Sequence, residues 1–397
     1  MPMLPATPVA SLSTASVRSG TRSNLADIDV MRGIAALVVA AMHTREITWV
    51  GMRVFWQQHG ADLAPDVAVG YATFPLVWGA IGVPIFFVLS GYCIHRTQAF
   101  ARAHGGAFQL SSANFLVRRF FRIYPVLFGA LLLTLLCDSL SRRYVPNSYK
   151  LGDTGTISFL VNLFSLQGVA GRTYGSNLPL WTLAIEVQFY VLYPLLLVLI
   201  SRLGSVTSLG ILVIGNIVSY FVAQRHGYEL FSSYYVSWYL GVLVAESEAA
   251  GLLSARLSSP GFRAALYGCS VVLLSVGCAT MFVSPYLAFQ VWAVAFSVFL
   301  FVVLKRSQGW RALPLRVFQW FGTFSFSIYI IHLPVIVLIH SIFFNSVHQS
   351  GIAPFFGTLV AVVGCAYVFS LVFERPALAL SQKFKGRRLV KSPAQQA

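Results

Sequence analysis

The sequence predicts an all-α protein: a polytopic membrane bundle of about ten transmembrane helices, with the N- and C-termini cytoplasmic. The first supporting observation is composition, since 57% of the 397 residues are hydrophobic and only 10% are charged. Soluble proteins carry about 25% charged residues. The second observation is that apolar stretches long enough to cross a bilayer recur from residue 31 to residue 373. The third is that basic residues concentrate in alternate connections between these stretches.

The apolar pattern predicts ten membrane spans, each with ends defined to within a few residues. They are 31–48, 72–95, 123–139, 179–201, 205–223, 232–247, 264–283, 285–304, 320–344 and 353–373. Residues 156–170 are apolar but too short to cross a bilayer. We therefore expect them to form a re-entrant or interfacial segment before the fourth span.

The formal net charge of +16 comes from 28 Lys and Arg residues against 12 Asp and Glu residues. With a cytoplasmic N-terminus, 20 of the 28 basic residues fall on the cytoplasmic side. Seven lie at or beyond the outer ends of the spans, and Arg32 lies inside the first span. This excess follows the positive-inside rule. The basicity therefore indicates topology rather than nucleic-acid binding, with a secondary attraction for anionic lipid or a phosphate-bearing donor.

Three segments are expected along the chain. Residues 1–24 contain no apolar core of signal-peptide length, so they are predicted to be a disordered cytoplasmic tail. Residues 25–376 form the membrane domain, and residues 377–397 form a basic cytoplasmic tail. The five cysteines occur singly, without Cys-x-x-Cys or Cys/His ligand spacing. Neither a disulfide framework nor a metal site is therefore expected.

The first span carries a cation near its start, Arg32, and an ionisable base near its end, His43. Their separation is about three helical turns, so both side chains share one helix face, about 16 Å apart along the axis. Ionisable side chains on an apolar helix usually face a partner or a water-filled cavity. A functional pair fits this spacing, and so does a boundary arginine with one structurally satisfied histidine.

Two later stretches add candidate binding groups. Ser90 lies in the Gly-rich end of the second span, either in a helix-packing seam or in contact with a substrate. Arg118, Arg119 and Arg122 precede the third span and lie on one side of a helix. Clustered guanidinium groups suit phosphate because they donate forked, charge-assisted hydrogen bonds. Ordinary positive-inside flanking explains the same cluster.

The fourth span places Glu186 about 10 Å from its outer end, with Tyr190 on the same face. His43 lies about 7 Å from the outer end of its own span, so the depths of the two side chains match. We hypothesise one buried polar cluster in which Glu186 orients or charges the imidazole of His43. A structural Glu186 satisfied by tyrosine and backbone is the alternative. His332, in the ninth span, either binds substrate or bonds within the bundle.

The order of these motifs resembles the integral-membrane acyltransferase family 3, whose members typically O-acylate carbohydrates of the cell envelope. The resemblance extends from about residue 25 to residue 376. It depends on six motifs in order: Asp29-x-x-Arg32 with His43, Phe86-Phe-Val-Leu-Ser-Gly91, Arg118-Arg-x-x-Arg-Ile-Tyr-Pro125, Leu180-Trp-Thr-Leu-x-x-Glu186-x-Gln-Phe-Tyr190, Ser325-x-Ser-x-Tyr-x-x-His332 and Glu374-Arg-Pro376.

The resemblance implies transfer of an acyl group, with acetyl preferred, from cytoplasmic acyl-CoA to a hydroxyl of an envelope or exported glycan, such as O-antigen or an exopolysaccharide. Imidazole has a pKa suited to taking the hydroxyl proton, so His43 is assigned as general base. Arg32 would bind the donor phosphate or carbonyl, and Glu186 completes the catalytic set. A relay through acyl-His43 is the rival mechanism, because imidazole can also be a nucleophile.

The remaining expectations concern partners and location. Arg118, Arg119 and Arg122 would hold the phosphates of acyl-CoA, while Ser90, Tyr190 and His332 would contact substrate. The partners expected are acyl-CoA, a glycan or lipid-linked glycan and the bilayer, with no nucleic acid, no permanently bound cofactor and no metal. The resemblance implies a location in a bacterial inner (plasma) membrane. A transporter or flippase of a glycan or lipid precursor is the alternative function, and a noncatalytic sensor is a third.

Overall fold

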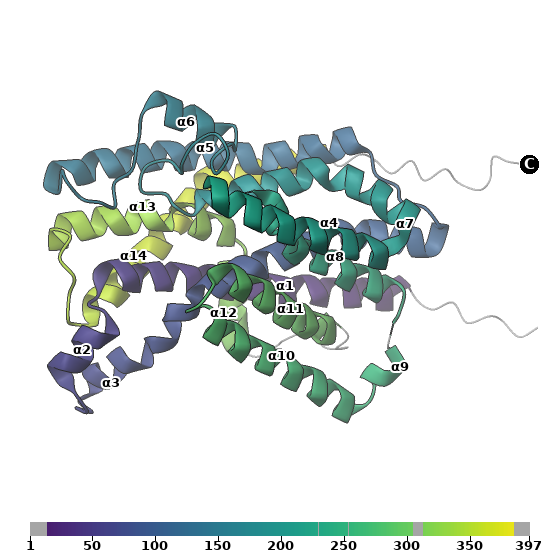
Figure 1. The fold of residues 1–397 in the computed structure, drawn as a ribbon, viewed down its shortest axis with the longest axis horizontal. Coiled ribbons are helices and arrows are strands. Elements are labelled where there is room, and N and C mark those ends of the chain that lie inside the picture. Colours follow the sequence, from purple (N-terminus) through teal and green to yellow (C-terminus); the bar gives the residue numbers. More distant parts are fainter. Residues whose placement is uncertain (1–13, 229, 253, 305–312, 385–397) are drawn as a thin grey trace, which may run out of the picture.

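The structure, a computed structural model, describes residues 14–228, 230–252, 254–304 and 313–384. Within these residues all regular elements are helical, and the extended pairings are two isolated bridges. Most of the helices lie side by side along one direction (Figure 1). In chain order they are α1 (Thr14–Thr48), α2 (Met52–His59), α3 (Pro65–Ala72), η1 (Phe74–Ile81), α4 (Gly82–Gly105), α5 (Ser112–Tyr144), α6 (Thr156–Leu163), α7 (Leu180–His226), η2 (Phe231–Ser233), α8 (Tyr235–Ala249), α9 (Ser254–Leu257), α10 (Pro260–Thr280), α11 (Pro285–Leu304), α12 (Leu313–Gly322), α13 (Ser325–Phe344), α14 (Ala353–Phe369), η3 (Ser370–Glu374) and α15 (Arg375–Lys383).

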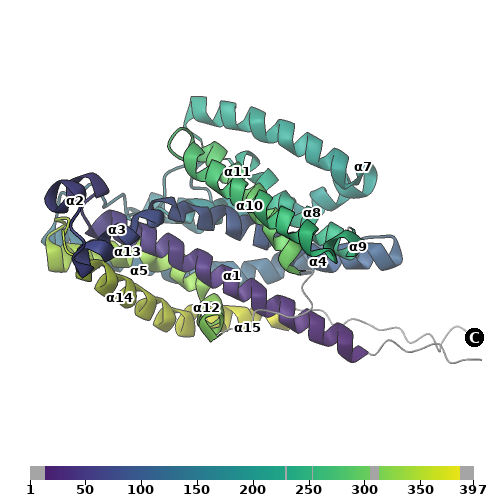
Figure 2. The ribbon, with the colours of Figure 1, turned by 90° about the horizontal axis from the view of Figure 1, so that it is seen from below.

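Seven helices among the described residues are long and apolar enough to cross a membrane. The chain is therefore a polytopic, all-α membrane protein, as the composition predicts. The prediction of ten crossings further requires that α7 cross twice around its break at Gly204, and that α1 and the 15-residue α8 each cross once. Figure 2 shows α7 at one edge of the bundle and α14 at the opposite edge, with α1 between them.

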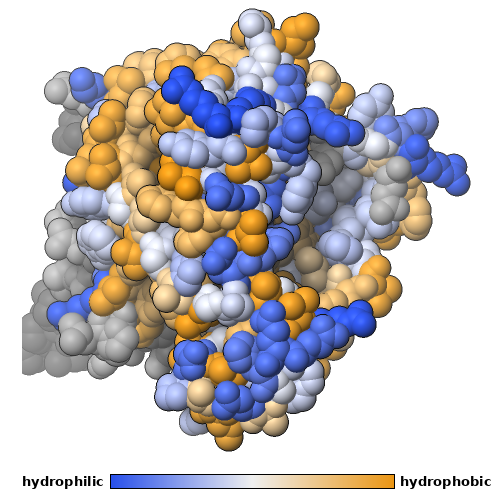
Figure 3. All heavy atoms as spheres, turned by 90° about the vertical axis from the view of Figure 1, so that its left-hand side faces the viewer, coloured by the Kyte–Doolittle hydropathy of each residue, from blue (hydrophilic) through white to orange (hydrophobic). Residues whose placement is uncertain are grey.

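One end of the bundle is formed by α2, α3 and the long connection that contains α6 (Figure 1). Hydrophilic residues gather across this end, and hydrophobic residues border them (Figure 3). A polar cap at the end of an apolar bundle fits the solvent-exposed side of a membrane protein, where the hydrocarbon region ends. The sequence prediction, with its cytoplasmic N-terminus, places this end on the outer side of the membrane.

Glycines permit close crossings between α4 and α8 and between α1 and α12. In α4, a Cβ on Gly91 would collide with the backbone carbonyl oxygen of Trp238 in α8, and Gly241 meets Val88 in the same way. In α12, a Cβ on Gly322 would collide with the backbone of Asp29 in α1. Small residues let membrane helices approach closely, and van der Waals packing is a main source of their association.

Pro334 shows how an interior proline is accommodated in α13. Proline has no N–H, so the carbonyl of Ile330, four residues earlier, loses its helical donor. Asn177, in the connection before α7, donates its Nδ2 to that carbonyl at 2.9 Å. Within a membrane an unpaired carbonyl is costly, and a neighbouring side chain restores the bond. Asn177 thereby ties α13, which carries His332, to the start of α7.

The helices differ from the expected spans in four places. Helix α1 begins at Thr14, so residues 14–24 of the expected tail are helical, while residues 1–13 lie outside the described part. The second span begins as the 3-10 helix η1 rather than as an α-helix. The ninth span is divided between Gly322 and Ser325. Residues 377–383 of the expected C-terminal tail continue α15, because helical backbone satisfies itself beyond the apolar region.

The short segment expected at 156–170 contains the eight-residue helix α6, Thr156–Leu163. Asn162 joins it to the following turn, donating from Nδ2 to the Arg172 carbonyl at 3.0 Å and accepting from the Tyr174 N–H at 3.1 Å. The helix is too short to cross a bilayer. The sequence prediction of a non-spanning segment before α7 is consistent with this geometry.

Candidate functional site

A cavity of about 550 Å³ opens between α1, α4, α5, α7 and α13. Its wall combines apolar side chains with six charged groups from three helices and η3, namely Asp29, Arg32, Arg119, Arg122, Glu186 and Glu374. Charged groups are costly within a membrane protein and collect where they can pair or meet water. Three guanidinium groups and three carboxylates share this one space, so their charges compensate one another.

Arg32 projects into the cavity from α1. Its Nη1 lies 3.9 Å from Oδ1 of Asp29, one turn earlier, and its Nη2 donates to Cys93 Sγ at 3.5 Å. Only 24% of the Arg32 side chain is exposed. A guanidinium has five donors, and these two long contacts leave several of them able to bind an anionic group in the cavity.

Glu186, another residue of the cavity wall, anchors a hydrogen-bonded cluster. Ser90, on α4, donates to Glu186 Oε1 at 2.8 Å, and the hydroxyl of Tyr190 donates to the same oxygen. The Trp238 indole N–H donates to Ser90 Oγ at 3.3 Å. Glu186 is therefore held by α4 and α7 side chains, not by His43 as hypothesised. Matching depth along two helix axes does not determine which sides of the helices face each other.

The arginine cluster on α5 is divided between cavity and periphery. Arg119 and Arg122 line the cavity, and the guanidinium of Arg119 lies 5.2 Å from the ring centroid of Tyr190. Arg118 is outside the cavity wall and donates to the carbonyl of Asn114 on its own helix at 3.3 Å. Successive helical residues are separated by about 100° around the axis. The expectation that all three arginines face one space is thus met by only two of them.

Glu374 is a cavity residue that the sequence analysis did not select for the site. Its Oε2 accepts hydrogen bonds from the backbone N–H of Ser327 at 3.0 Å and from Ser327 Oγ at 2.5 Å. Ser327 lies in the first turn of α13, where N–H groups have no helical acceptor and the helix dipole favours negative charge. The Glu374-Arg-Pro376 motif was the signal that could have identified it.

His43 pairs with His332 rather than with a carboxylate. His43 Nδ1 lies 2.8 Å from His332 Nε2, and the two rings stack with centroids 5.0 Å apart. His332 Nδ1 lies 2.8 Å from the carbonyl oxygen of Tyr329. Since a carbonyl only accepts, the hydrogen of a neutral His332 is on Nδ1 and its Nε2 is an acceptor.

This hydrogen-bond chain fixes the tautomer of His43. In the neutral pair, His43 Nδ1–H donates to His332 Nε2, so His43 Nε2 carries an unprotonated lone pair. Among the described residues, Nε2 of His43 has no hydrogen-bond partner, and the ring is only partly buried. His332 is fully buried. The arrangement is that of an oriented base whose proton-accepting nitrogen is free.

The histidine pair lies beside the cavity rather than in its wall. Tyr329 joins the two regions, because its carbonyl accepts from His332 and its side chain lines the cavity. The Tyr329 hydroxyl also pairs with Thr182 Oγ1 at 2.8 Å. Of the residues selected from sequence, Arg32, Ser90, Arg119, Arg122, Glu186 and Tyr190 line the cavity, whereas His43, His332 and Arg118 do not.

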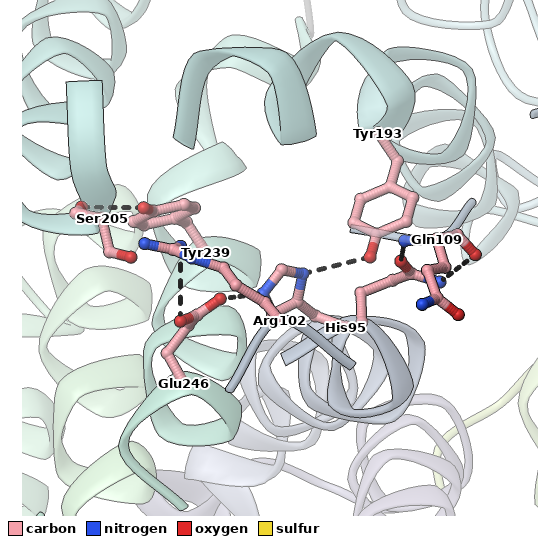
Figure 4. A network of polar contacts seen from close by, with 8 residues as sticks. His95, Arg102, Gln109, Tyr193, Ser205, Tyr239 and Glu246 are labelled. Carbon is pink, nitrogen blue, oxygen red and sulfur yellow. Dashed lines mark hydrogen bonds and ion pairs between the residues drawn. The ribbon is translucent and has the colours of Figure 1, made fainter. Parts of the chain in front are cut away.

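A second polar network lies outside the cavity, between α4, α7 and α8 (Figure 4). Fully buried His95 contacts Glu246 Oε1 through Nε2 at 2.7 Å and the Tyr193 hydroxyl through Nδ1 at 3.1 Å. Arg102 Nη1 lies 3.5 Å from Glu246 Oε2. Because Tyr193 lies about two turns after Glu186 on α7, this network helps to hold the register of the helices that carry the Glu186 cluster.

No group of three or more His, Cys, Asp and Glu side chains with the geometry to hold a metal ion occurs in the part of the chain that the structure describes. The five cysteines are free thiols. The polar side chains in and beside the cavity are arginines, carboxylates, hydroxyls and the neighbouring imidazole pair.

The helical fold and the cavity define a polytopic membrane protein with a charged site between its helices. Residues 25–371 match the acyltransferase domain family, and the chain belongs to that family. The resemblance drawn from the six sequence motifs is thereby confirmed. No solved structure matches the chain.

Among curated relatives, the chain is 28% identical over 291 residues to YrhL of Bacillus subtilis (strain 168), which is named as a candidate peptidoglycan O-acetyltransferase. It is 24% identical over 292 residues to peptidoglycan O-acetyltransferase OatA of Listeria monocytogenes. These matches cover 66% of the chain but only 44% and 45% of the two relatives, so the chain spans less than half of their length. Acyltransferase MdmB of Streptomyces mycarofaciens is 25% identical over 322 residues, 77% of each protein.

Proposed function

We propose that this protein is a membrane O-acyltransferase that moves an acyl group, acetyl in the simplest case, from acyl-CoA to a hydroxyl of an envelope or exported glycan. The acyltransferase family supports the reaction class. Two relatives are named for O-acetylation of peptidoglycan, which supports a carbohydrate acceptor. The observation that carries the proposal is a base with a free nitrogen, His43 Nε2, beside a cavity lined by three arginines.

The donor would bind through its phosphates in the charged cavity. Arg119 and Arg122 line that space and lie near the start of α5, at the end of the bundle expected to be cytoplasmic. Guanidinium groups donate paired, charge-assisted hydrogen bonds to phosphate oxygens. Arg118 would add only peripheral attraction, since it is outside the cavity wall. Arg32 would contact the donor closer to its thioester carbonyl.

Transfer would begin when His43 Nε2 takes the proton of the acceptor hydroxyl. The hydroxyl oxygen forms a bond to the thioester carbonyl carbon, and the carbon–sulfur bond then breaks. The proton held on Nε2 passes to the departing thiolate, so the products are an O-acyl glycan and free coenzyme A thiol. His332 Nε2 accepts from His43 Nδ1 throughout, which keeps the imidazole oriented and stabilises its protonated form.

The carboxylates would balance the positive charge of the cavity and orient its polar side chains rather than react. Glu186 and Asp29 compensate the charge of Arg32, and Glu186 also holds Ser90 and Tyr190 through hydrogen bonds. Ser90 and Tyr190 are then oriented to contact substrate. A positive guanidinium near the thioester carbonyl would stabilise the negative charge that develops on its oxygen in the transition state.

The proposal is tested by mass spectrometry of surface glycans from cells that produce the wild type or His43→Ala. The expected result is loss of an O-acyl group from the glycan in His43→Ala, with unmodified glycan still exported. His226→Ala, at the exposed end of α7, is the matched control and is expected to retain acylation. Loss of export with unchanged acylation would contradict the enzyme and support the transporter alternative.

A further inference from the structure

A second large space lies away from the charged cavity, between the two halves of α7. It measures about 710 Å³, and most of its lining is apolar, including Leu196, Leu199 and Leu212. The first half of α7 contributes residues 192–203, and the second half contributes residues 211–216. Several lining side chains, such as Leu195 and Ile211, are exposed at the surface, so the groove opens towards the surroundings of the bundle.

The groove has one charged residue in its lining, at the turn of α7. Gly204 adopts φ 81° and ψ 165°, which reverses the helix, and Arg202 lies just before it. Arg202 is exposed, and within the described residues it forms no ion pair with a carboxylate. A further cavity, separate from the groove, is lined by residues 194–201 of α7 together with Arg102 and Ser112. The turn of α7 at Gly204 therefore lies at the same end of the bundle as the α4–α5 connection.

We propose that this groove binds a glycerophospholipid, with one acyl chain between the halves of α7 and the phosphate at Arg202. An empty apolar groove forfeits dispersion contacts, and in a bilayer the molecules that reach it are lipids. The 12 residues from Gly204 to Asn216 extend about 18 Å, close to the depth of one leaflet. Arg202 supplies the charge that complements a phosphate at the interface.

A lipid in this position would support the helix that carries the Glu186 cluster. Leu192, the first lining residue of the groove, follows Tyr190 by two positions on α7. One face of the second half of α7 packs against little other protein, since Ile214, Val218 and Phe221 on it are 65%, 55% and 61% exposed. We therefore expect bound phospholipid to raise the thermal stability of the purified protein. This inference does not depend on the reaction proposed above.

Gly215 offers a direct test, because it lines the groove and a Cβ built there meets no atom within 4 Å. Gly215→Phe should fill the groove without displacing protein atoms. Gly210, on the same half-helix, is equally open but does not line the groove, so Gly210→Phe is the matched control. Native mass spectrometry in detergent with added phosphatidylglycerol should show one retained lipid for wild type and Gly210→Phe, and none for Gly215→Phe.

The contribution of the phosphate is tested by comparing phosphatidylglycerol with a diacylglycerol that has the same acyl chains but no phosphate. Wild type is expected to bind phosphatidylglycerol about tenfold more tightly than diacylglycerol, and Arg202→Gln should remove this preference. Arg225→Gln, at the far end of α7, is expected to keep it. Retention of the lipid by Gly215→Phe would overturn the groove as the binding site. An unchanged preference in Arg202→Gln would overturn the phosphate contact.

Discussion

At the scale of single residues, the orientation of His43 depends on a chain of hydrogen bonds that begins at a backbone carbonyl. The Tyr329 carbonyl assigns the hydrogen of His332, and His332 assigns the hydrogen of His43. In serine hydrolases a carboxylate orients the catalytic histidine in a comparable way. A neutral imidazole in that role avoids placing another charge in the membrane bundle, where an unpaired charge is expensive.

His332 is therefore predicted to be a positioning residue. His332→Ala should lower kcat about 10²-fold with little change in the KM for acyl-CoA, because the base loses its orientation while the donor site is intact. His332→Gln should recover part of the rate, since its side-chain oxygen can accept from His43 Nδ1. The ¹⁵N NMR signals of His43 should show Nδ1 protonated in the wild type. A kcat for His332→Ala within about twofold of wild type would rule this role out.

The arginines of α5 give a second residue-level prediction. Arg119→Gln should raise the KM for acyl-CoA about tenfold, because it removes a charge-assisted bond to phosphate in the cavity. Arg118→Gln is the matched control, since Arg118 is a direct neighbour in sequence but lies outside the cavity wall. Steady-state kinetics on equal amounts of membrane-embedded protein make the comparison. Equal KM increases for the two variants would place the donor elsewhere.

At the scale of elements, the sequence predicts helix positions well because long apolar runs and flanking charges indicate where each helix enters and leaves the bilayer. Helix α11, Pro285–Leu304, matches its predicted span at both ends. The break between Gly322 and Ser325 could not be predicted, because it depends on two long-range contacts. Gly322 packs against the Asp29 backbone, and Glu374 caps the new helix at Ser327.

The crossing of α4 and α8 yields a prediction about packing. Gly91→Ala should lower the free energy of unfolding by about 1–3 kcal/mol, because its Cβ would collide with the Trp238 carbonyl and push the helices apart. Gly268→Ala on α10 is the control, since a Cβ there meets no atom within 4 Å. Thermal unfolding of both variants in the same detergent provides the measurement. Similar melting temperatures for both would show that the crossing tolerates a methyl group.

At the scale of the whole molecule, the sequence identified most of the charged cavity residues but not their pairings. Helical spacing places Arg32 and His43 on one face of α1, and both side chains contact the bundle rather than lipid. Spacing gives no information on which neighbouring helix faces them. The assignment of Glu186 to His43 failed for that reason. His332, for which a substrate contact and a bond within the bundle were both open, bonds to His43.

The orientation of the bundle in the membrane is predicted from its charges and is testable directly. Asn147 lies in the connection predicted to be outside, and Ala103 lies near the α4–α5 connection predicted to be cytoplasmic; both are exposed. A membrane-impermeant maleimide should label Asn147→Cys in intact cells and Ala103→Cys only after permeabilisation. Labelling of the parent protein corrects for its own thiols. The reverse pattern would invert the topology and move the arginine cavity to the wrong side for a cytoplasmic donor.

The most direct test of the central claim measures acyl transfer by purified protein in lipid nanodiscs, with labelled acetyl-CoA and a glycan acceptor. If the free Nε2 of His43 is the base, His43→Ala should lower kcat by at least about 10²-fold while acetyl-CoA still binds with nearly wild-type affinity. A His43→Ala protein that transfers acetyl groups at the wild-type rate would contradict the account.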